Sequence, residues 1–221
     1  MINTPQMAAW VNSFGREYTD RNALDTSQHE ALYERNYGVT RRELNEPFLA
    51  EVPAGARILE VGCNVGNQLE VLTQMGYREL YGIEIQPYAL EQARANLPDA
   101  HFVEACAFEI PYPDHYFDMV FTSGVLIHIA PADLPRAIDE IHRCASQYIW
   151  GFEYYSPQAM QVKYRGNEGL LWKMDYAKLY LDLFADLSLV RRKEVPYLEN
   201  CNVDSMFLLG KAMDPQVGDQ K

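Results

Sequence analysis

The sequence predicts an α/β protein, with a mostly parallel sheet covered by helices and an antiparallel hairpin at its C-terminal end. Short apolar runs alternate with helical patterns between residues 57 and 152, which is typical of parallel strands joined by crossover helices. A glycine-bearing turn follows the first apolar run. Two further strand-like runs then follow one another at 188–195 and 203–211. With five earlier runs, they predict a seven-stranded sheet.

The individual elements follow from apolar runs, capping residues and breakers. The first 50 residues are polar and aromatic and predict helices, one of them capped by Thr26 or Ser27. The expected strands before the hairpin are 57–61, 80–85, 101–105, 117–122 and 148–152. The expected helices of the sheet region are 68–75, 87–98, 131–144 and 176–184. Pro87 suits the first turn of its helix.

The regular alternation stops after residue 152. Residues 153–175 are rich in aromatic residues, glycine and charge and have no clear period, so we expect an insertion that forms a lid. The expected organisation is a helical cap over 1–50, a sheet domain over 51–213 that carries this insertion, and a disordered tail over 214–221.

Composition narrows the class of partner. The formal net charge of −12 would repel a phosphate backbone, so we expect a small-molecule substrate and no nucleic acid. No run approaches the roughly 20 apolar residues of a membrane span. No basic-then-apolar leader is recognised, which favours a cytoplasmic protein, as a monomer or homodimer. The scattered 4 cysteines and 5 histidines predict neither a disulfide framework nor a metal site.

The most informative segment is residues 58–66, where an apolar strand containing Glu60 runs into a turn with Gly62, Asn64 and Gly66. The next strand ends in Glu84. Such a turn and acid build a nucleotide pocket at the carboxyl edge of a parallel sheet, the acid accepting hydrogen bonds from both ribose hydroxyls.

A dinucleotide is the competing ligand for this turn. Its fingerprint requires glycine two residues after Gly62 and again three residues later. The chain has Asn64 and Asn67 at these positions, which disfavours the close approach of a pyrophosphate. Asparagine tolerates left-handed backbone, so the turn itself is expected to survive.

Together these segments give the chain a family resemblance. It resembles class I S-adenosylmethionine (SAM) methyltransferases, and more closely the methylases associated with pseudaminic acid biosynthesis. The residues that carry this resemblance are Phe14, Gly15, Tyr18, Asp20, Arg21, Asn22, Glu60, Val61, Gly62, Asn64, Gly66, 82–85, 124–129, Arg143, Cys144, 153–155, 164–166, Lys173 and Asp175. The resemblance implies a Rossmann-like methyltransferase fold, SAM as cofactor and a biosynthetic role.

The resemblance also implies roles for individual residues. Glu84, with Ile85 beside it, would hold the ribose, and Gly62 and Asn64 the methionine and ribose edge. Cys106 and Ala107 lie where such enzymes hold the adenine, although Cys106 replaces the acid that is frequent there.

The N-terminal cluster is expected to complete the cofactor site. Arg21 would clamp the methionine carboxylate, and Tyr18 would pack over the sulfonium. At the end of the fourth strand, Ser123 would contact SAM. His128 is a candidate general base, and the alternative is that it only orders its loop.

The insertion and the residue that follows it supply the candidates for the reaction itself. Tyr154, Tyr155 and Tyr176 form an expected aromatic, polar wall, which suits methyl transfer to a polar small molecule such as a sugar or nucleotide-sugar. Two alternatives stay open. Similar enzymes cyclise SAM to azetidine-2-carboxylic acid and release methylthioadenosine, and tyrosines suit the alignment of the SAM amine. The second alternative is a SAM-binding partner protein without catalytic activity.

Overall fold

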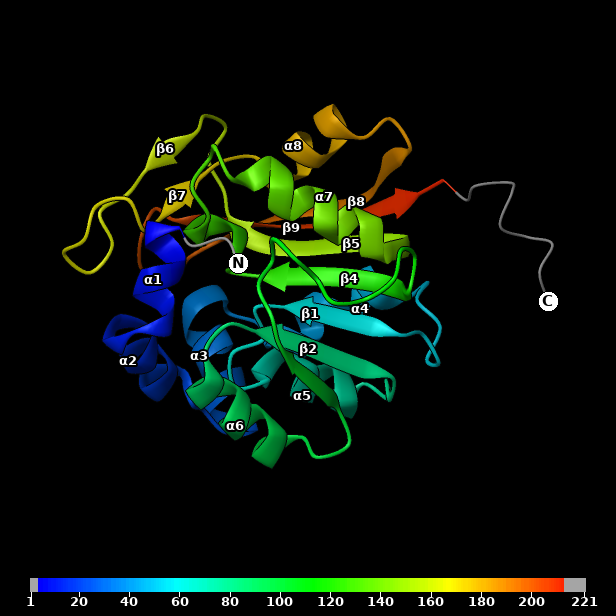
Figure 1. Cartoon of the computed structure of the whole chain (residues 1–221), viewed down its shortest axis with the longest axis horizontal. Helices are drawn as coiled ribbons and strands as arrows, with labels where there is room; N and C mark the ends of the chain where they lie inside the picture. Colours follow the sequence, from blue (N-terminus) through cyan, green and yellow to red (C-terminus); the bar gives the residue numbers. More distant parts are fainter. Residues whose placement is uncertain (1–3, 213–221) are drawn as a thin grey trace.

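A computed structural model describes residues 4–212, and its main feature is a sheet of seven strands in the order β3-β2-β1-β4-β5-β9-β8. The pairs among β1 to β5 are parallel. β9 is antiparallel to both of its neighbours. The expected α/β fold with a C-terminal antiparallel hairpin is therefore confirmed (Figure 1).

The observed elements agree with the expected ones to within a few residues, except where noted below. The strands are β1 (Ile58–Val61), β2 (Leu80–Glu84), β3 (His101–Glu104), β4 (Phe117–Ser123), β5 (Ala145–Tyr154), β6 (Met160–Gln161), β7 (Trp172–Lys173), β8 (Leu187–Pro196) and β9 (Val203–Lys211). The helices are α1 (Pro5–Val11), α2 (Ser13–Asn22), α3 (Thr26–Tyr37), α4 (Arg41–Leu49), α5 (Asn67–Gln74), α6 (Pro87–Asn96), the 3-10 turn η1 (Leu126–His128), α7 (Leu134–Cys144) and α8 (Tyr176–Leu183).

Helices cover both faces of the sheet because successive strand residues point to opposite sides. On β4, Val120 packs in the cluster that contains the buried faces of α7 and α8. Its neighbours Met119 and Phe121 pack in the other cluster, with α4 and α5. All of β1 is buried, as expected for a strand at the centre of a parallel sheet.

Two expected boundaries were wrong. The cap of α3 is Asp25, whose side chain accepts a hydrogen bond from Gln28 N while the Gln28 side chain accepts one from Asp25 N. This reciprocal capping box fixes the helix start one residue earlier than expected. β5 continues through Tyr154, because its last residues pair with β9, so the insertion begins after Tyr154. The expected disordered tail, 214–221, lies outside the described residues.

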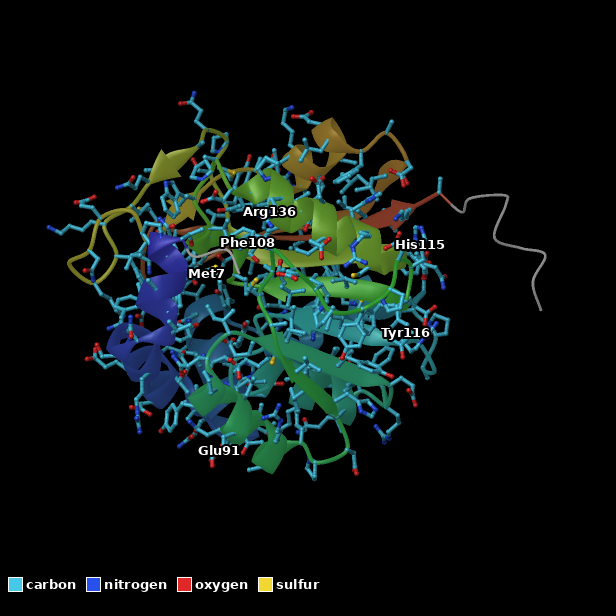
Figure 2. All side chains as sticks on the ribbon, in the orientation of Figure 1. Met7, Glu91, Phe108, His115, Tyr116 and Arg136 are labelled. Atoms are coloured by element: carbon cyan, nitrogen blue, oxygen red, sulfur yellow. The ribbon has the colours of Figure 1, made fainter. Side chains whose placement is uncertain are left out.

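The insertion holds the short hairpin of β6 and β7. It is tied to the N-terminal region, since Gln6 Nε2 donates to the Gly169 carbonyl at 2.9 Å. Figures 1 and 2 show that α1, which carries Met7, lies at the end of the sheet to which β4 points, while His115 and Tyr116 lie at the opposite end. The carboxyl edge of the strands is thus the covered one. None of the helices within 4–212 is both long and apolar enough to cross a membrane.

Candidate functional site

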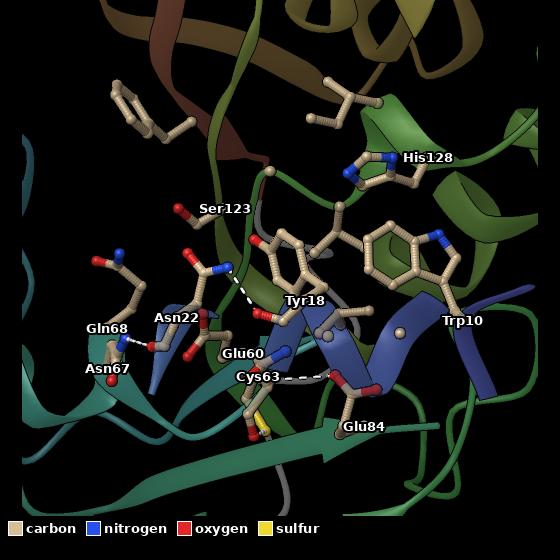
Figure 3. A pocket seen from close by; sticks show the side chains of 18 of the residues that line it. Trp10, Tyr18, Asn22, Glu60, Cys63, Asn67, Gln68, Glu84, Ser123 and His128 are labelled. Carbon is tan, nitrogen blue, oxygen red and sulfur yellow. Dashed lines mark hydrogen bonds between the residues drawn. The ribbon is translucent and has the colours of Figure 1, made fainter. Parts of the chain in front are cut away.

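A cavity of about 400 Å³ lies at the carboxyl edge of β1, β2 and β4, within the size range of small-molecule sites. It sits where the strand order reverses between β1 and β4, which is the usual ligand position in such sheets. Helices α1 to α3 and the insertion contribute to its lining. Figure 3 shows Glu60, Ser123 and Tyr18 around the same space, with Trp10 and His128 to one side.

The turn after β1 forms the floor of the cavity. Asn64 adopts φ +48° and Gly66 φ +86°, so the expectation that asparagine would sustain the left-handed turn is confirmed. The Asn64 side chain holds the turn in place: its Oδ1 accepts from Val65 N at 2.8 Å, and its Nδ2 donates to Thr19 Oγ1 at 3.2 Å. A Cβ on Gly62 would lie 2.7 Å from Val125 Cγ2, so glycine is required where this turn meets the next.

Glu84 joins the two strand ends. Its carboxylate accepts hydrogen bonds from Asn64 N at 3.0 Å, Ile85 N at 2.8 Å and Gln86 N at 3.0 Å. Burial raises its pKa, and these three hydrogen bonds act in the opposite direction. Glu84 therefore fixes the turn as well as facing the cavity.

Glu60 is a second carboxylate in the lining, and it is only 2% exposed. Its Oε2 atom has no hydrogen-bond partner within residues 4–212. Burial raises its pKa well above the usual range, and the charge of Arg41 lowers it. A buried, unpartnered carboxylate oxygen in a cavity wall is a site for a ligand that donates hydrogen bonds.

His128 connects the loop after β4 to the insertion. Its Nδ1 lies 2.7 Å from the Leu170 carbonyl, and since a carbonyl only accepts, Nδ1 carries the hydrogen and Nε2 the lone pair of the neutral ring. Burial lowers its pKa to about 4. The centroid of its ring lies 4.5 Å from that of Trp10 and 5.3 Å from that of Tyr164. His128 therefore also holds α1 and the insertion together over the cavity.

The opposite end of the cavity contains a carboxylate among tyrosines. Asp204, at the start of β9, accepts a hydrogen bond from the Tyr37 hydroxyl. The Tyr197 hydroxyl lies 3.4 Å from that of Tyr154. All four line the cavity. We call them the acceptor-end cluster: Tyr37, Tyr154, Tyr197 and Asp204.

A buried arginine lies behind the wall between the two ends. Arg41 is 0% exposed. Its Nη1 donates to the hydroxyls of Tyr33 at 2.8 Å and Ser123 at 3.2 Å, both of which line the cavity. Since both hydroxyl oxygens accept from Arg41, their own hydrogens are free to be donated elsewhere.

Most residues predicted for the site line the cavity, and three do not. Those in the lining are Tyr18, Glu60, Gly62, Asn64, Glu84, Ile85, Cys106, Ala107, Ser123, His128 and Tyr154. Arg21 lies outside the lining, 3.9 Å from the exposed Glu17. Tyr155 also lies outside it, with its ring 4.9 Å from the Arg192 guanidinium. It follows Tyr154 at the end of an extended strand, where neighbouring side chains point to opposite sides.

Tyr176 is the third correction. It is buried in the α8 side of the core, and its hydroxyl donates to the Trp172 carbonyl. Sequence reasoning in turn missed Asp204, Tyr37, Tyr197 and Arg41 as site residues. The signal for Asp204 was an acid two residues before the apolar run Met206–Leu209 of the last strand.

Comparison with known proteins agrees with the fold. Residues 59–147 match the family model described as a methyltransferase domain. An uncharacterized methyltransferase, sll0829, from Synechocystis is 33% identical over 92 residues, which are 42% of this chain and 43% of that protein. The chain thus matches less than half the length of the first curated relatives.

Solved structures resemble nearly the whole chain. The Burkholderia thailandensis 1,6-didemethyltoxoflavin-N1-methyltransferase, with bound S-adenosylhomocysteine, has a TM-score of 0.69 at 17% identity and covers 96% of this chain and 92% of its own. Magnesium protoporphyrin IX methyltransferase from Synechocystis, with bound SAM, has a TM-score of 0.66 at 15% identity, over 96% and 100%. Residues 59–147 thus match a methyltransferase domain, and nearly the whole chain shares the fold of solved SAM-dependent methyltransferases.

Proposed function

We propose that the protein is a SAM-dependent enzyme that transfers a methyl group to a polar small molecule. The observation that carries the proposal is the continuity of the cavity. It joins the carboxyl edge of the sheet, with Glu60, Asn64 and Glu84, to the acceptor-end cluster, and we assign SAM to the first of these two parts. An enzyme that joins two substrates needs room for both in one space that excludes water.

The residues of the cofactor edge fit SAM. Glu60 Oε2, buried and without a partner, suits the ammonium of the methionine part. Glu84 suits the ribose, because each carboxylate oxygen accepts more than one hydrogen bond. The Tyr18 ring in the lining suits a sulfonium, and the segment Cys106–Ala107 suits the adenine.

SAM, when bound, supplies a methyl group that is already activated by the positive sulfur. The chain then needs to orient the acceptor and exclude water rather than to generate a strong nucleophile. Helices α1 to α3 cover the cavity, and His128 connects the insertion to α1 through its contacts with the Leu170 carbonyl and the Trp10 ring. As a neutral ring with a lone pair on Nε2, His128 also has the protonation state of a general base.

The polar lining of the acceptor end also bears on the chemical class of the acceptor. A sugar or nucleotide-sugar is the favoured class, in line with the resemblance to the methylases of pseudaminic acid biosynthesis and with the polar lining of the acceptor end. The overall charge of −12 argues against a nucleic acid.

Incubation with SAM alone, followed by product analysis, tests the proposal. We expect no turnover without an acceptor, and S-adenosylhomocysteine once a polar acceptor such as a sugar is added. Methylthioadenosine with azetidine-2-carboxylate, formed from SAM alone, would instead establish the cyclase. Tight binding of SAM without any product would establish a binding protein. The variant Glu84→Ala serves as the control for products that do not arise in this site.

A further inference from the structure

The acceptor-end cluster is organised around a single buried carboxylate. Asp204 is 4% exposed and lines the cavity. The register of the sheet places it opposite Tyr154 on β5 and Val195 on β8. Burial raises its pKa to about 6, and the neighbouring hydroxyls of Tyr37 and Tyr197 and the charges of Arg41 and Lys173 lower it. The group is therefore largely ionised at neutral pH.

This charge has no direct counter-ion within the protein. No cationic nitrogen of residues 4–212 lies within 4.0 Å of the Asp204 carboxylate. Arg41 donates instead to Asn45, Tyr33 and Ser123. Lys173 donates to Asn202 and lies 4.8 Å from the Tyr154 ring. A buried carboxylate without a paired cation is costly, and a cationic group of a ligand in the cavity would offset that cost.

The surroundings of Asp204 suit a cation in particular. The rings of Tyr37 and Tyr197 lie 4.7 Å apart, and those of Tyr154 and Tyr197 lie 5.9 Å apart. Aromatic faces attract ammonium groups, most strongly where water is excluded. The net charge of −12 also raises the local concentration of cationic over anionic small molecules.

We propose that the acceptor-end cluster binds a protonated amine, so that the acceptor is an amine-bearing small molecule anchored by Asp204. This inference rests on the proposed function, because it names the substrate class of the same cavity. The amine is the group that is recognised. Which atom of the acceptor receives the methyl group depends on the rest of that molecule.

Binding of matched amine and alcohol pairs tests the proposal. The probes are glucosamine with glucose, cyclohexylamine with cyclohexanol, and 1-aminobutane with 1-butanol, titrated calorimetrically at pH 7.5 with S-adenosylhomocysteine present. We expect at least one amine to bind about tenfold more tightly than its alcohol. Asp204→Asn, which keeps the shape and removes the charge, should abolish the preference. Asp182→Asn, an exposed residue paired with Lys178, is the matched control and should retain it.

Two results would overturn the proposal: no amine preferred over its alcohol by the native protein, or a preference that survives in Asp204→Asn. Circular dichroism and the melting temperature show whether Asp204→Asn has folded. If it has not, Tyr197→Phe, which removes a hydroxyl beside Asp204, should reduce the preference instead, and an unchanged preference there counts against the cluster. S-adenosylhomocysteine affinity is measured separately. If the native protein does not bind S-adenosylhomocysteine, the proposed function is contradicted. If Asp204→Asn still binds S-adenosylhomocysteine but has lost the amine preference, the effect concerns Asp204 alone.

Discussion

The two ends of the cavity are assembled from the sequence in different ways. The proposed cofactor end takes Glu60, Asn64 and Glu84 from two consecutive strands and the turn between them. The proposed acceptor end takes Tyr37 from α3, Tyr154 from β5 and Asp204 from β9, which meet because β5 pairs with β9 and α3 packs against that pair. The first end is therefore fixed by local spacing within one βαβ unit, and the second by pairing between distant segments.

This difference bears on what each end does. A local unit can be kept while the distant segments change, so one cofactor end can serve many acceptors. Substitutions at each end can separate the two ends further or remove the distinction between them.

The largest effect is expected at the cofactor end. Glu84→Ala should weaken S-adenosylhomocysteine binding about 1,000-fold, because two hydrogen bonds to a charged group are lost at about 1.5–3 kcal/mol each. The same change frees the backbone N–H groups of Asn64, Ile85 and Gln86, so the melting temperature should fall too. Calorimetry measures the affinity, and Glu79→Ala, at an exposed residue just before the same strand, is the control. Unchanged affinity would remove Glu84 from the cofactor site.

The second effect concerns His128, which joins α1 to the insertion over the cavity. Its folded pKa of about 4 is below the unfolded value near 6.5, so its contribution is present above pH 6.5 and is lost as the pH falls toward 4. We expect about 2 kcal/mol of this loss between pH 7 and pH 5. His128→Phe keeps a ring against Trp10 and Tyr164 but does not titrate. Urea unfolding at both pH values should show a smaller loss in the variant. Because His29 is present in both proteins, their difference isolates His128, and parallel losses would contradict its neutral, buried state.

How far the sequence predicts the site follows from the same comparison. The turn at Asn64 and the acid at Glu84 could be placed because strand, turn and helix follow one another within a short stretch. The burial of Asp204 could not, since it depends on which strand lies beside β9. Arg41 is absent from the prediction for a related reason: an arginine near a helix start is usually exposed, and only the packing of α4 under the sheet buries it.

Tyr154 and Tyr155 show how far the sequence can predict the role of a single residue. With β5 expected to end at residue 152, Tyr154 and Tyr155 were equivalent parts of a loop. The strand in fact runs through Tyr154, and alternation then sends only one of the two toward the cavity. A shift of two residues in a strand boundary therefore changes which side chain is available for function.

Tyr154 and Tyr155 differ in position but not in chemistry, so the same substitution can be compared at both. Tyr154→Phe should lower kcat/KM for the acceptor about tenfold, as the loss of one hydrogen bond in a binding site commonly does. Tyr155→Phe should leave kcat/KM within about twofold of the native value, since its hydroxyl lies outside the lining and its ring contact with Arg192 is kept. Both variants should bind S-adenosylhomocysteine normally. Equal losses in both would mean that the insertion rearranges when the acceptor binds.

The smallest effect is expected for Arg21, the residue that the sequence suggested as a carboxylate clamp. In the structure it lies 3.9 Å from Glu17, itself 70% exposed, and such surface pairs contribute about 0–1 kcal/mol. Arg21→Ala should therefore change S-adenosylhomocysteine affinity less than about twofold, and Glu17→Ala, which removes the other partner, should do the same. A loss of tenfold or more in Arg21→Ala alone would show that α2 turns its arginine into the cavity when the cofactor binds. The cofactor end would then also depend on a distant segment, and the contrast between the two ends would be one of degree.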